Sequence, residues 1–285
     1  MELKRIVFTF TALLLLCQAA WAETKQSEFA LFKRTISPVY KWGANGAITV
    51  PKAVPVGKGT IYLGSSIQDS GKIEGDRLFL TDVTLMAGTS DDVEFGWTKR
   101  QFIWDDFDKT DLSMDTFNFK ARIFHMTDAY IPQIAIGLNA VSLSENEFSE
   151  EEDILFNPFI TTTIQAPFMD NKVVVSATGV IEAIHNEGKS SELFFSAAAD
   201  VTLFDMLCLI TEVHGLNKAE EDYIFNIGAR ATYGWFSIGI ASYNLVEGDV
   251  KAEEGSSEND STDIKAYALV EVPFMSFFKK EEKKE

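Results

Sequence analysis

Apolar and polar residues alternate along most of this chain, and the clearest example is the stretch from Thr116 to Ser142. In its first half, one set of alternate positions is apolar: Phe117, Phe119, Ala121 and Ile123. Because successive side chains of a β-strand leave opposite faces of the sheet, a period of two indicates a strand. A turn containing Asp128 and Pro132 precedes a second alternating run, so the stretch predicts two antiparallel strands.

The same period recurs from residue 60 to residue 274 and predicts an all-β protein with about twelve strands. The expected strands span residues 60–66, 77–89, 93–104, 116–123, 133–142, 154–168, 173–184, 193–203, 207–216, 223–233, 235–243 and 264–274. Most of them reach the roughly 9–11 residues that a tilted strand needs to cross a bilayer. An even number of antiparallel strands, each with one apolar and one polar face, is typical of a transmembrane β-barrel.

The first 22 residues have the three parts of a secretory signal peptide. Lys4 and Arg5 form the basic part, residues 6–16 the apolar part, and residues 20–22 (AWA) the cleavage site. The apolar run is short for a membrane-spanning helix, which favours cleavage over an N-terminal anchor. No later run reaches about 18 apolar residues, so any further crossing of a membrane must use strands.

The connections between the expected strands alternate between long and short. Long, polar connections follow every second strand, at residues 67–76, 105–115, 143–153, 185–192, 217–222 and 244–263. Tight ones lie between them, for example at residues 90–92, 169–172 and 205–206 and at Gly234. Strict alternation places all long loops at one end of a barrel and both chain termini at the other, which is the arrangement of an outer-membrane barrel.

The chain carries 43 acidic and 25 basic residues, for a formal net charge of −18. This acidic balance argues against nucleic acid or an anionic surface as a partner. Of the two cysteines, only Cys208 lies beyond the expected signal peptide, so no intramolecular disulfide is expected in the mature chain. The remaining length fits one barrel or sandwich domain better than two compact domains.

Ahead of the first expected strand, residues 43–66 read GANGAITVPKAVPVGKGTIYLGSS. This segment resembles the start of the YjbH-type outer-membrane β-barrel family, with a glycine-rich turn, a P-x-A step and a glycine before the first strand. The matching residues are Gly43, Gly46, Pro51, Ala53, Gly57, Gly59 and Gly64. The resemblance implies a barrel associated with exopolysaccharide export. Small residues and prolines ahead of a strand also have a purely structural explanation.

The sequence contains no recognisable catalytic or metal-binding motif. Its three histidines, His125, His185 and His214, are not spaced as zinc ligands, and it has no nucleophile elbow, P-loop or dinucleotide fingerprint. The acidic stretches 144–153 and 247–263 offer oxygen ligands but lack EF-hand spacing, and we interpret them as solvated loops. We therefore expect no catalytic residue, no metal site and no cofactor.

Charged residues on the polar faces of the expected strands are the candidates for lining a lumen. They are Glu94, Arg100, Lys120, Arg122, Glu182, Asp200, Glu212, Arg230, Lys265 and Glu271. Arg100, Lys120 and Arg122 belong to neighbouring strands and share one wall. Glu182, Asp200 and Glu212 lie roughly across the ring of twelve strands. This placement predicts a transverse field that orients a polar solute. Pairing that only stiffens the barrel is the alternative.

Two features of the sequence fit a barrel less well than the rest. The charged tail KKEEKKE (residues 279–285) follows the last aromatic residues, where barrels often end on an aromatic. In the expected strand 207–216, Cys208 and Ile210 put apolar side chains on the nominally polar face. A secreted, soluble β-sandwich that serves as a binding module is therefore the alternative to the barrel.

We expect four segments along the chain: a signal peptide (1–22), a periplasmic lead-in or partial plug (23–58), a β-barrel (59–275) and a charged periplasmic tail (276–285). The expected function is a narrow, porin-like channel of the bacterial outer membrane, or an export accessory, without enzymatic activity. Its solute would be a polysaccharide or another polar molecule. The expected partners are outer-membrane lipid, the barrel-assembly machinery, and a polysaccharide or export partner, but no nucleic acid.

Overall fold

The computed structural model describes residues 46–73, 76–104, 113–124, 131–143, 154–186, 192–217, 224–243 and 263–272. The expected signal peptide, the first part of the lead-in and the charged tail lie outside these residues. The strands are β1 (Ile61–Ile73), β2 (Asp76–Gly88), β3 (Val93–Trp104), β4 (Ser113–Phe124), β5 (Gln133–Leu143), β6 (Ile154–Phe168), β7 (Val173–Asn186), β8 (Glu192–Leu203), β9 (Leu207–His214), β10 (Ile224–Tyr233), β11 (Phe236–Tyr243) and β12 (Asp263–Val272). None of the described residues belongs to a helix long and apolar enough to span a membrane.

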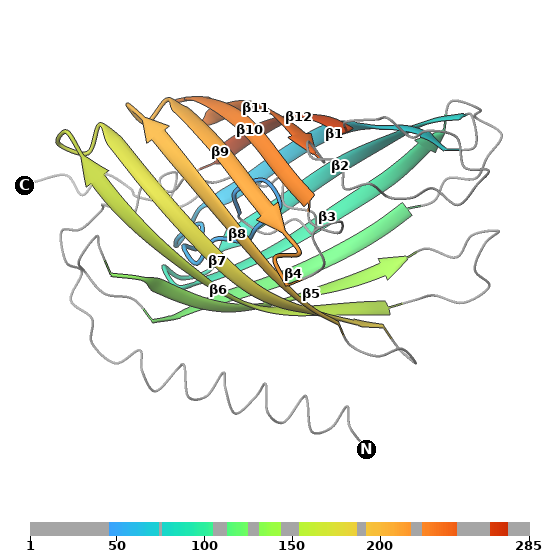
Figure 1. Ribbon diagram of the computed structural model, residues 1–285, viewed down its shortest axis with the longest axis horizontal. Helices are drawn as coiled ribbons and strands as arrows, with labels where there is room; N and C mark the ends of the chain where they lie inside the picture. The colour runs from blue at the N-terminus through green and yellow to red at the C-terminus, as the bar shows by residue number, and fades with distance from the viewer. Residues whose placement is uncertain are drawn as a thin grey trace, which may run out of the picture. The chain divides into compact units, whose positions relative to one another are not determined.

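The twelve strands form one closed sheet in which each strand pairs with its neighbours in chain order (Figure 1). β1 closes the ring by pairing with β12, from Ile61↔Val272 to Asp69↔Ile264. All neighbouring pairs are antiparallel, as an even number of strands allows. The expected antiparallel barrel of about twelve strands is confirmed. A single closed sheet also excludes the alternative of a sandwich, which needs two sheets packed face to face.

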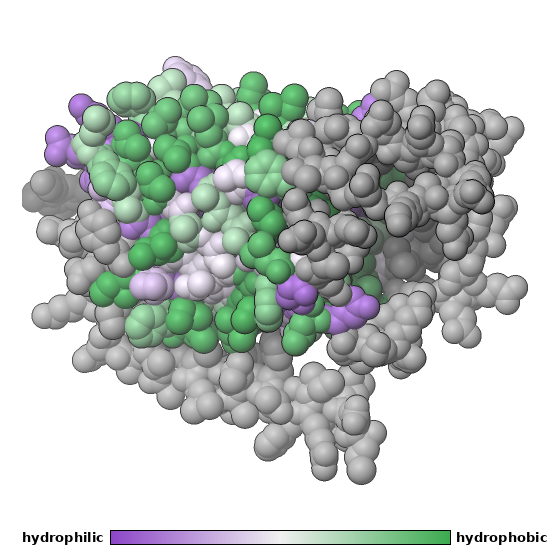
Figure 2. Space-filling view, in the orientation of Figure 1, coloured by the Kyte–Doolittle hydropathy of each residue, from purple (hydrophilic) through white to green (hydrophobic). Residues whose placement is uncertain are grey.

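The alternation in the sequence sorts side chains between the outside and the inside of the barrel. Along β6, Ile160 and Ile164 are 54% and 37% exposed, whereas Thr161 and Thr163 are fully buried. Figure 2 shows hydrophobic side chains gathered over the visible exterior of the described strands. An apolar exterior around a polar interior is the arrangement of bacterial outer-membrane barrels, and by this architecture the protein is one of them.

Two connections differ from the expected alternation of long and short loops. Only residues 74–75 separate β1 from β2, where the sequence predicts a long loop at residues 67–76. Backbone pairing continues through a register shift between Asp69 and Lys72, because strands can stay paired where neither face is apolar. At the opposite rim, residues 125–132 separate β4 from β5 and are longer than a tight turn. Strict alternation is therefore wrong at these two connections.

Candidate functional site

Residues 46–59, here called the plug segment, run inside the barrel before the chain enters β1 (Figure 1). The side chains of Ile48, Val50, Ala53 and Val56 are all 0% exposed, and Lys58 near the end of the segment is exposed. A buried segment without regular secondary structure needs partners for its backbone N–H and C=O groups. The barrel wall supplies many of these partners.

Glycine and proline shape the plug segment into a turn followed by an extended run. Residues 46–51 form the turn, which an isolated antiparallel bridge between Gly46 and Pro51 closes. Gly57 has a φ of +83°, which L side chains rarely adopt, and it redirects the chain toward β1. The Gly57 carbonyl lies against Gly88 of β2, where a Cβ would be 1.8 Å from the carbonyl oxygen. These two glycines fix the point at which the plug segment joins the wall.

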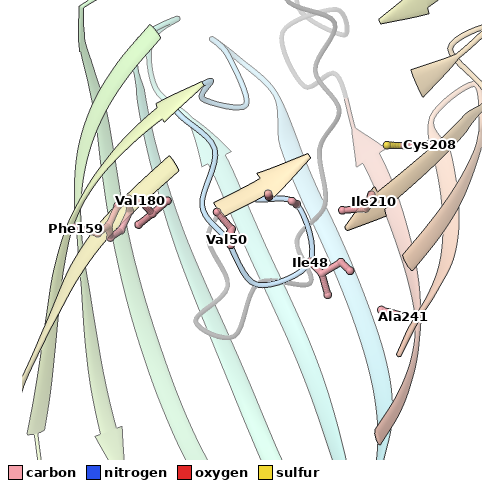
Figure 3. Packing of buried hydrophobic residues seen from close by; sticks show 9 residues of the cluster. Ile48, Val50, Phe159, Val180, Cys208, Ile210 and Ala241 are labelled. Atoms are coloured by element: carbon pink, nitrogen blue, oxygen red, sulfur yellow. The ribbon is translucent and has the colours of Figure 1, made fainter. Parts of the chain in front are cut away.

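The turn of the plug segment packs between opposite walls of the barrel (Figure 3). Ile48 lies toward Ile210 and Ala241, whereas Phe159 and Val180 lie on the other side of the turn in this view. Together the plug and wall residues form one buried apolar cluster, made of Ala47, Ile48, Val50, Phe159, Val180, Ala198, Cys208, Ile210 and Ala241. Because the wall residues come from five strands, β6 to β9 and β11, the turn spans the lumen.

The carboxylate of Glu212 on β9 holds the tip of the turn. The backbone N–H of Thr49 donates to its two oxygens at 2.8 and 2.9 Å, and that of Val50 donates to Oε1 at 3.1 Å. The backbone N–H of Ile48 donates to Oε1 as well, and the Thr49 hydroxyl donates to Oε2 at 2.8 Å. Glu212 is only 1% exposed, and a buried carboxylate is stabilised when such donors surround it.

A hydroxyl–imidazole cluster lies beside Glu212. His214 Nε2 contacts the Thr49 hydroxyl, and His214 Nδ1 lies 3.0 Å from the Ser196 hydroxyl. Asn226 on β10 donates from Nδ2 to Glu212 Oε2 at 3.3 Å. A carboxylate, an imidazole and a hydroxyl also make up hydrolytic triads. In this barrel His214 Nε2 also lies 3.5 Å from Glu212 Oε2, and both side chains bind the tip of the plug segment, so the cluster holds the plug segment in place.

A second ionic contact anchors the middle of the plug segment. Lys52 Nζ lies 2.6 Å from Asp200 Oδ2 of β8, and both side chains are almost completely buried. On β6, which β7 separates from β8, the Thr161 hydroxyl donates to the Pro51 carbonyl at 2.6 Å and the Thr163 hydroxyl accepts from Ala53 N–H at 2.9 Å. The segment is therefore tied to β6 and β8 at neighbouring residues.

A third contact lies where the plug segment approaches β3. Val56 N–H donates to Glu94 Oε2 at 2.8 Å, and Glu94 Oε1 lies 2.7 Å from Lys120 Nζ on β4. Both charged side chains are 0% exposed. We use the name plug-binding site for five of the wall residues whose side chains bind the plug segment: Glu94, Thr161, Thr163, Asp200 and Glu212.

Most of the candidate lumen residues are buried inside the barrel. Glu94, Arg100, Lys120, Asp200, Glu212 and Arg230 are buried, and Arg122 and Glu182 are partly buried. The side chains of Lys265 and Glu271 lie outside the described part of the chain. Three of the buried carboxylates, Glu94, Asp200 and Glu212, come together around the plug segment, which the sequence did not indicate.

Each of the three cations on the expected positive wall has an anionic partner. Arg100 makes two bonds to Asp82 of β2, at 2.6 and 3.1 Å, and Arg122 lies 2.6 Å from Asp92. Lys120 pairs with Glu94 at 2.7 Å. Each cation has an anion on its own wall because a buried charge is costly unless it is paired. The predicted transverse field is therefore wrong on the β2–β4 side.

Several residues of the site were missed by sequence reasoning. Lys52 and Thr49 belong to the lead-in, for which the sequence has no strand period that would assign a face. Asp82 lies on the polar face of β2, directly opposite Arg100 in the register, and that pairing is a signal that could have found it. The described residues hold no group of three or more His, Cys, Asp or Glu side chains placed to bind a metal ion.

Similar folds occur among outer-membrane barrels of known structure, whereas no protein-family model and no curated protein matches the sequence. The KdgM porin shares 9% identity at a TM-score of 0.47, over 74% of this chain and 98% of that one. LpxR from Salmonella typhimurium shares 9% sequence identity at a TM-score of 0.47, over 73% of this chain and 99% of that one. The Acinetobacter baumannii outer membrane protein Omp33 shares 7% sequence identity at a TM-score of 0.43, over 75% of this chain and 98% of that one. The YjbH-type resemblance stays a prediction.

Proposed function

We propose that this protein is a narrow outer-membrane channel whose lumen is closed by its own plug segment. The observation that carries the proposal is that buried polar side chains of the wall, above all Asp200 and Glu212, hold residues 46–59. Polar contacts can be exchanged for contacts with water, so a segment held in this way can leave while the strands stay paired. Twelve strands lie between the eight that side chains fill and the sixteen of open porins.

A polar solute, such as a polysaccharide, is the substrate class we propose for this channel. Toward the rim opposite Ile61, Asn139 Nδ2 donates to Asn157 Oδ1 at 2.8 Å, and Asn157 Nδ2 donates to Glu182 Oε2 at 3.2 Å. Amide and carboxylate groups of this kind can exchange hydrogen bonds with the hydroxyl groups of a sugar. The YjbH-type resemblance supports the same class and adds an export partner. Lipid around the apolar exterior and the barrel-assembly machinery are further proposed partners.

Replacing Lys52 by alanine is expected to increase the fraction of time for which the channel is open. The change removes the 2.6 Å ion pair and leaves the buried Asp200 carboxylate without the ammonium of the plug segment. The strands do not depend on this contact, so the barrel should remain folded. The full-length proteins are reconstituted in planar lipid bilayers. The wild type should show rare, brief channel openings, and the Lys52→Ala variant should show longer ones.

Lys58→Ala is the matched control for this experiment. It removes the same charge from the same segment, but the Lys58 side chain is exposed and lies outside the plug-binding site. It should conduct like the wild type. Heat-modifiable migration on gels verifies that each variant is folded. A folded Lys52→Ala variant that stays as silent as the wild type at every applied voltage would contradict a channel closed by the plug segment.

A further inference from the structure

The plug segment supplies bonding partners to the acidic wall of the lumen. Asp200 and Glu212 on β8 and β9 are 2% and 1% exposed. Asp200 binds the Lys52 ammonium, and Glu212 accepts backbone N–H groups from three successive residues, 48–50. When the plug segment leaves, both carboxylates lose these partners. We propose that the open channel therefore selects cations, and that small organic cations carrying a primary ammonium group are among the polar solutes that it passes.

The charges that remain in the wall support this selection. Among the residues whose side chains are described, the buried or half-buried lumen-facing carboxylates are Asp82, Glu94, Glu182, Asp200 and Glu212, and the buried lumen-facing wall cations are Arg100, Lys120 and Arg230. Five anions against three cations leave two negative charges once Lys52 is gone. Arg122 and Asp92 cancel at the rim. A net negative charge in a narrow, low-dielectric passage concentrates cations and excludes anions.

The plug segment itself shows the chemistry that the wall accepts. A primary ammonium lies 2.6 Å from Asp200 Oδ2, and the Thr161 and Thr163 hydroxyls on β6 bind polar backbone groups. Glu212 accepts several N–H donors in the same region. A diamine offers an ammonium for Asp200 and a second for Glu212, so it can replace the contacts that the plug segment makes. This inference rests on the proposed function, because it requires a lumen that opens.

Reversal potentials measured across a KCl gradient test the inference on the full-length chain. The Lys52→Ala variant provides the open channel, and its reversal potential should be shifted from zero toward the equilibrium potential of K⁺. Adding Asp200→Asn or Glu212→Gln should shift the reversal potential toward zero, because each change removes one carboxylate from the acidic wall. Asp170→Asn, in the exposed turn between β6 and β7, removes an equal charge outside the plug-binding site and should leave the value unchanged.

A diamine, 1,4-diaminobutane, is the probe for the solute class. It should reduce the K⁺ current of Lys52→Ala, and Asp200→Asn should abolish the reduction. A current with no preference for cations, or one unaffected by the diamine, would overturn the inference and leave the proposed channel standing. A folded Lys52→Ala variant that carries no current at all would overturn the channel, and the inference with it. Heat-modifiable migration again separates a silent channel from an unfolded protein.

Discussion

Replacing Lys120 by methionine is expected to lower the free energy of unfolding by about 3–5 kcal/mol, as for other buried ion pairs that lose one partner. Lys120 Nζ lies 2.7 Å from Glu94 Oε1, and neither side chain is exposed to solvent. Methionine fills a similar volume but removes the ammonium that neutralises the Glu94 carboxylate, and the neutral Val56 N–H that also donates to this carboxylate cannot replace the lost charge. Denaturant-induced unfolding in phospholipid vesicles measures the change.

The double variant Glu94→Gln/Lys120→Met is the control for this prediction. Glutamine keeps an oxygen that can accept from the Val56 N–H, and neither charge of the pair remains in the wall. Most of the stability lost in Lys120→Met should therefore return, because the cost comes from an unpaired buried charge rather than from lost packing. Equal losses in the single and double variants would show that burial of the Glu94 charge does not decide the stability.

Arginine in place of Ile160 is expected to destabilise the membrane-inserted barrel by roughly 2–4 kcal/mol, the cost of a cation on the lipid face near the bilayer midplane. Ile160 lies near the middle of β6, and its side chain is 54% exposed on the outer surface. Outside the barrel no polar group of the wall can replace the water that the guanidinium loses. Unfolding from phospholipid vesicles measures this loss as well.

Tyr233→Arg is the comparison for the lipid face. Tyr233 ends β10 at the turn into β11 and is 82% exposed, so an arginine there can reach water and should cost about 0–1 kcal/mol. The prediction is that Ile160→Arg lowers the free energy of unfolding more than Tyr233→Arg does. If Ile160→Arg is as stable as Tyr233→Arg, the exterior of β6 does not face the hydrocarbon of a membrane.

The strands and their faces could be predicted because alternation is a local property of the sequence. In β6 the even-numbered residues from Ile154 to Ile164 are exposed and mostly apolar, whereas the residues between them are buried or half-buried and mostly polar. The loop lengths were less predictable. The residues from Ile67 to Ile73 lack apolar alternation, yet their backbone pairs with β2. Strand pairing needs only backbone hydrogen bonds, so polar strands can extend where a hydrophobic pattern has ended.

The plug-binding site could not be predicted because its contacts join residues far apart in the chain. Thr49 binds Glu212 across 163 positions, and the lead-in has no period that would place Thr49 or Lys52 on a face. One signal was present in the sequence. Cys208 and Ile210 look misplaced on the polar face of β9, and they are buried against the turn of the plug segment. An apolar residue on the inner face of a barrel strand can thus indicate that something packs in the lumen.

The partner of each cation could not be predicted for a related reason. The sequence places Arg100, Lys120 and Arg122 on one wall, but it does not show which anion stands opposite each cation without the strand register. In the structure, Asp82 is directly opposite Arg100 and Glu94 is directly opposite Lys120. Cross-strand pairing of opposite charges is favourable, so these neighbours neutralise the wall where the sequence alone suggested a field.

Reaction of Cys208 with a membrane-impermeant thiol reagent tests most directly whether the plug segment closes the lumen. Cys208 faces the lumen, is 2% exposed and belongs to the apolar cluster that surrounds Ile48. Leu216→Cys in a Cys208→Ala background provides a freely accessible thiol, since Leu216 is 56% exposed. In the folded wild type Cys208 should remain unlabelled, and in Lys52→Ala it should react. Labelling of wild-type Cys208 as fast as the thiol at position 216 would contradict a lumen closed by residues 46–59.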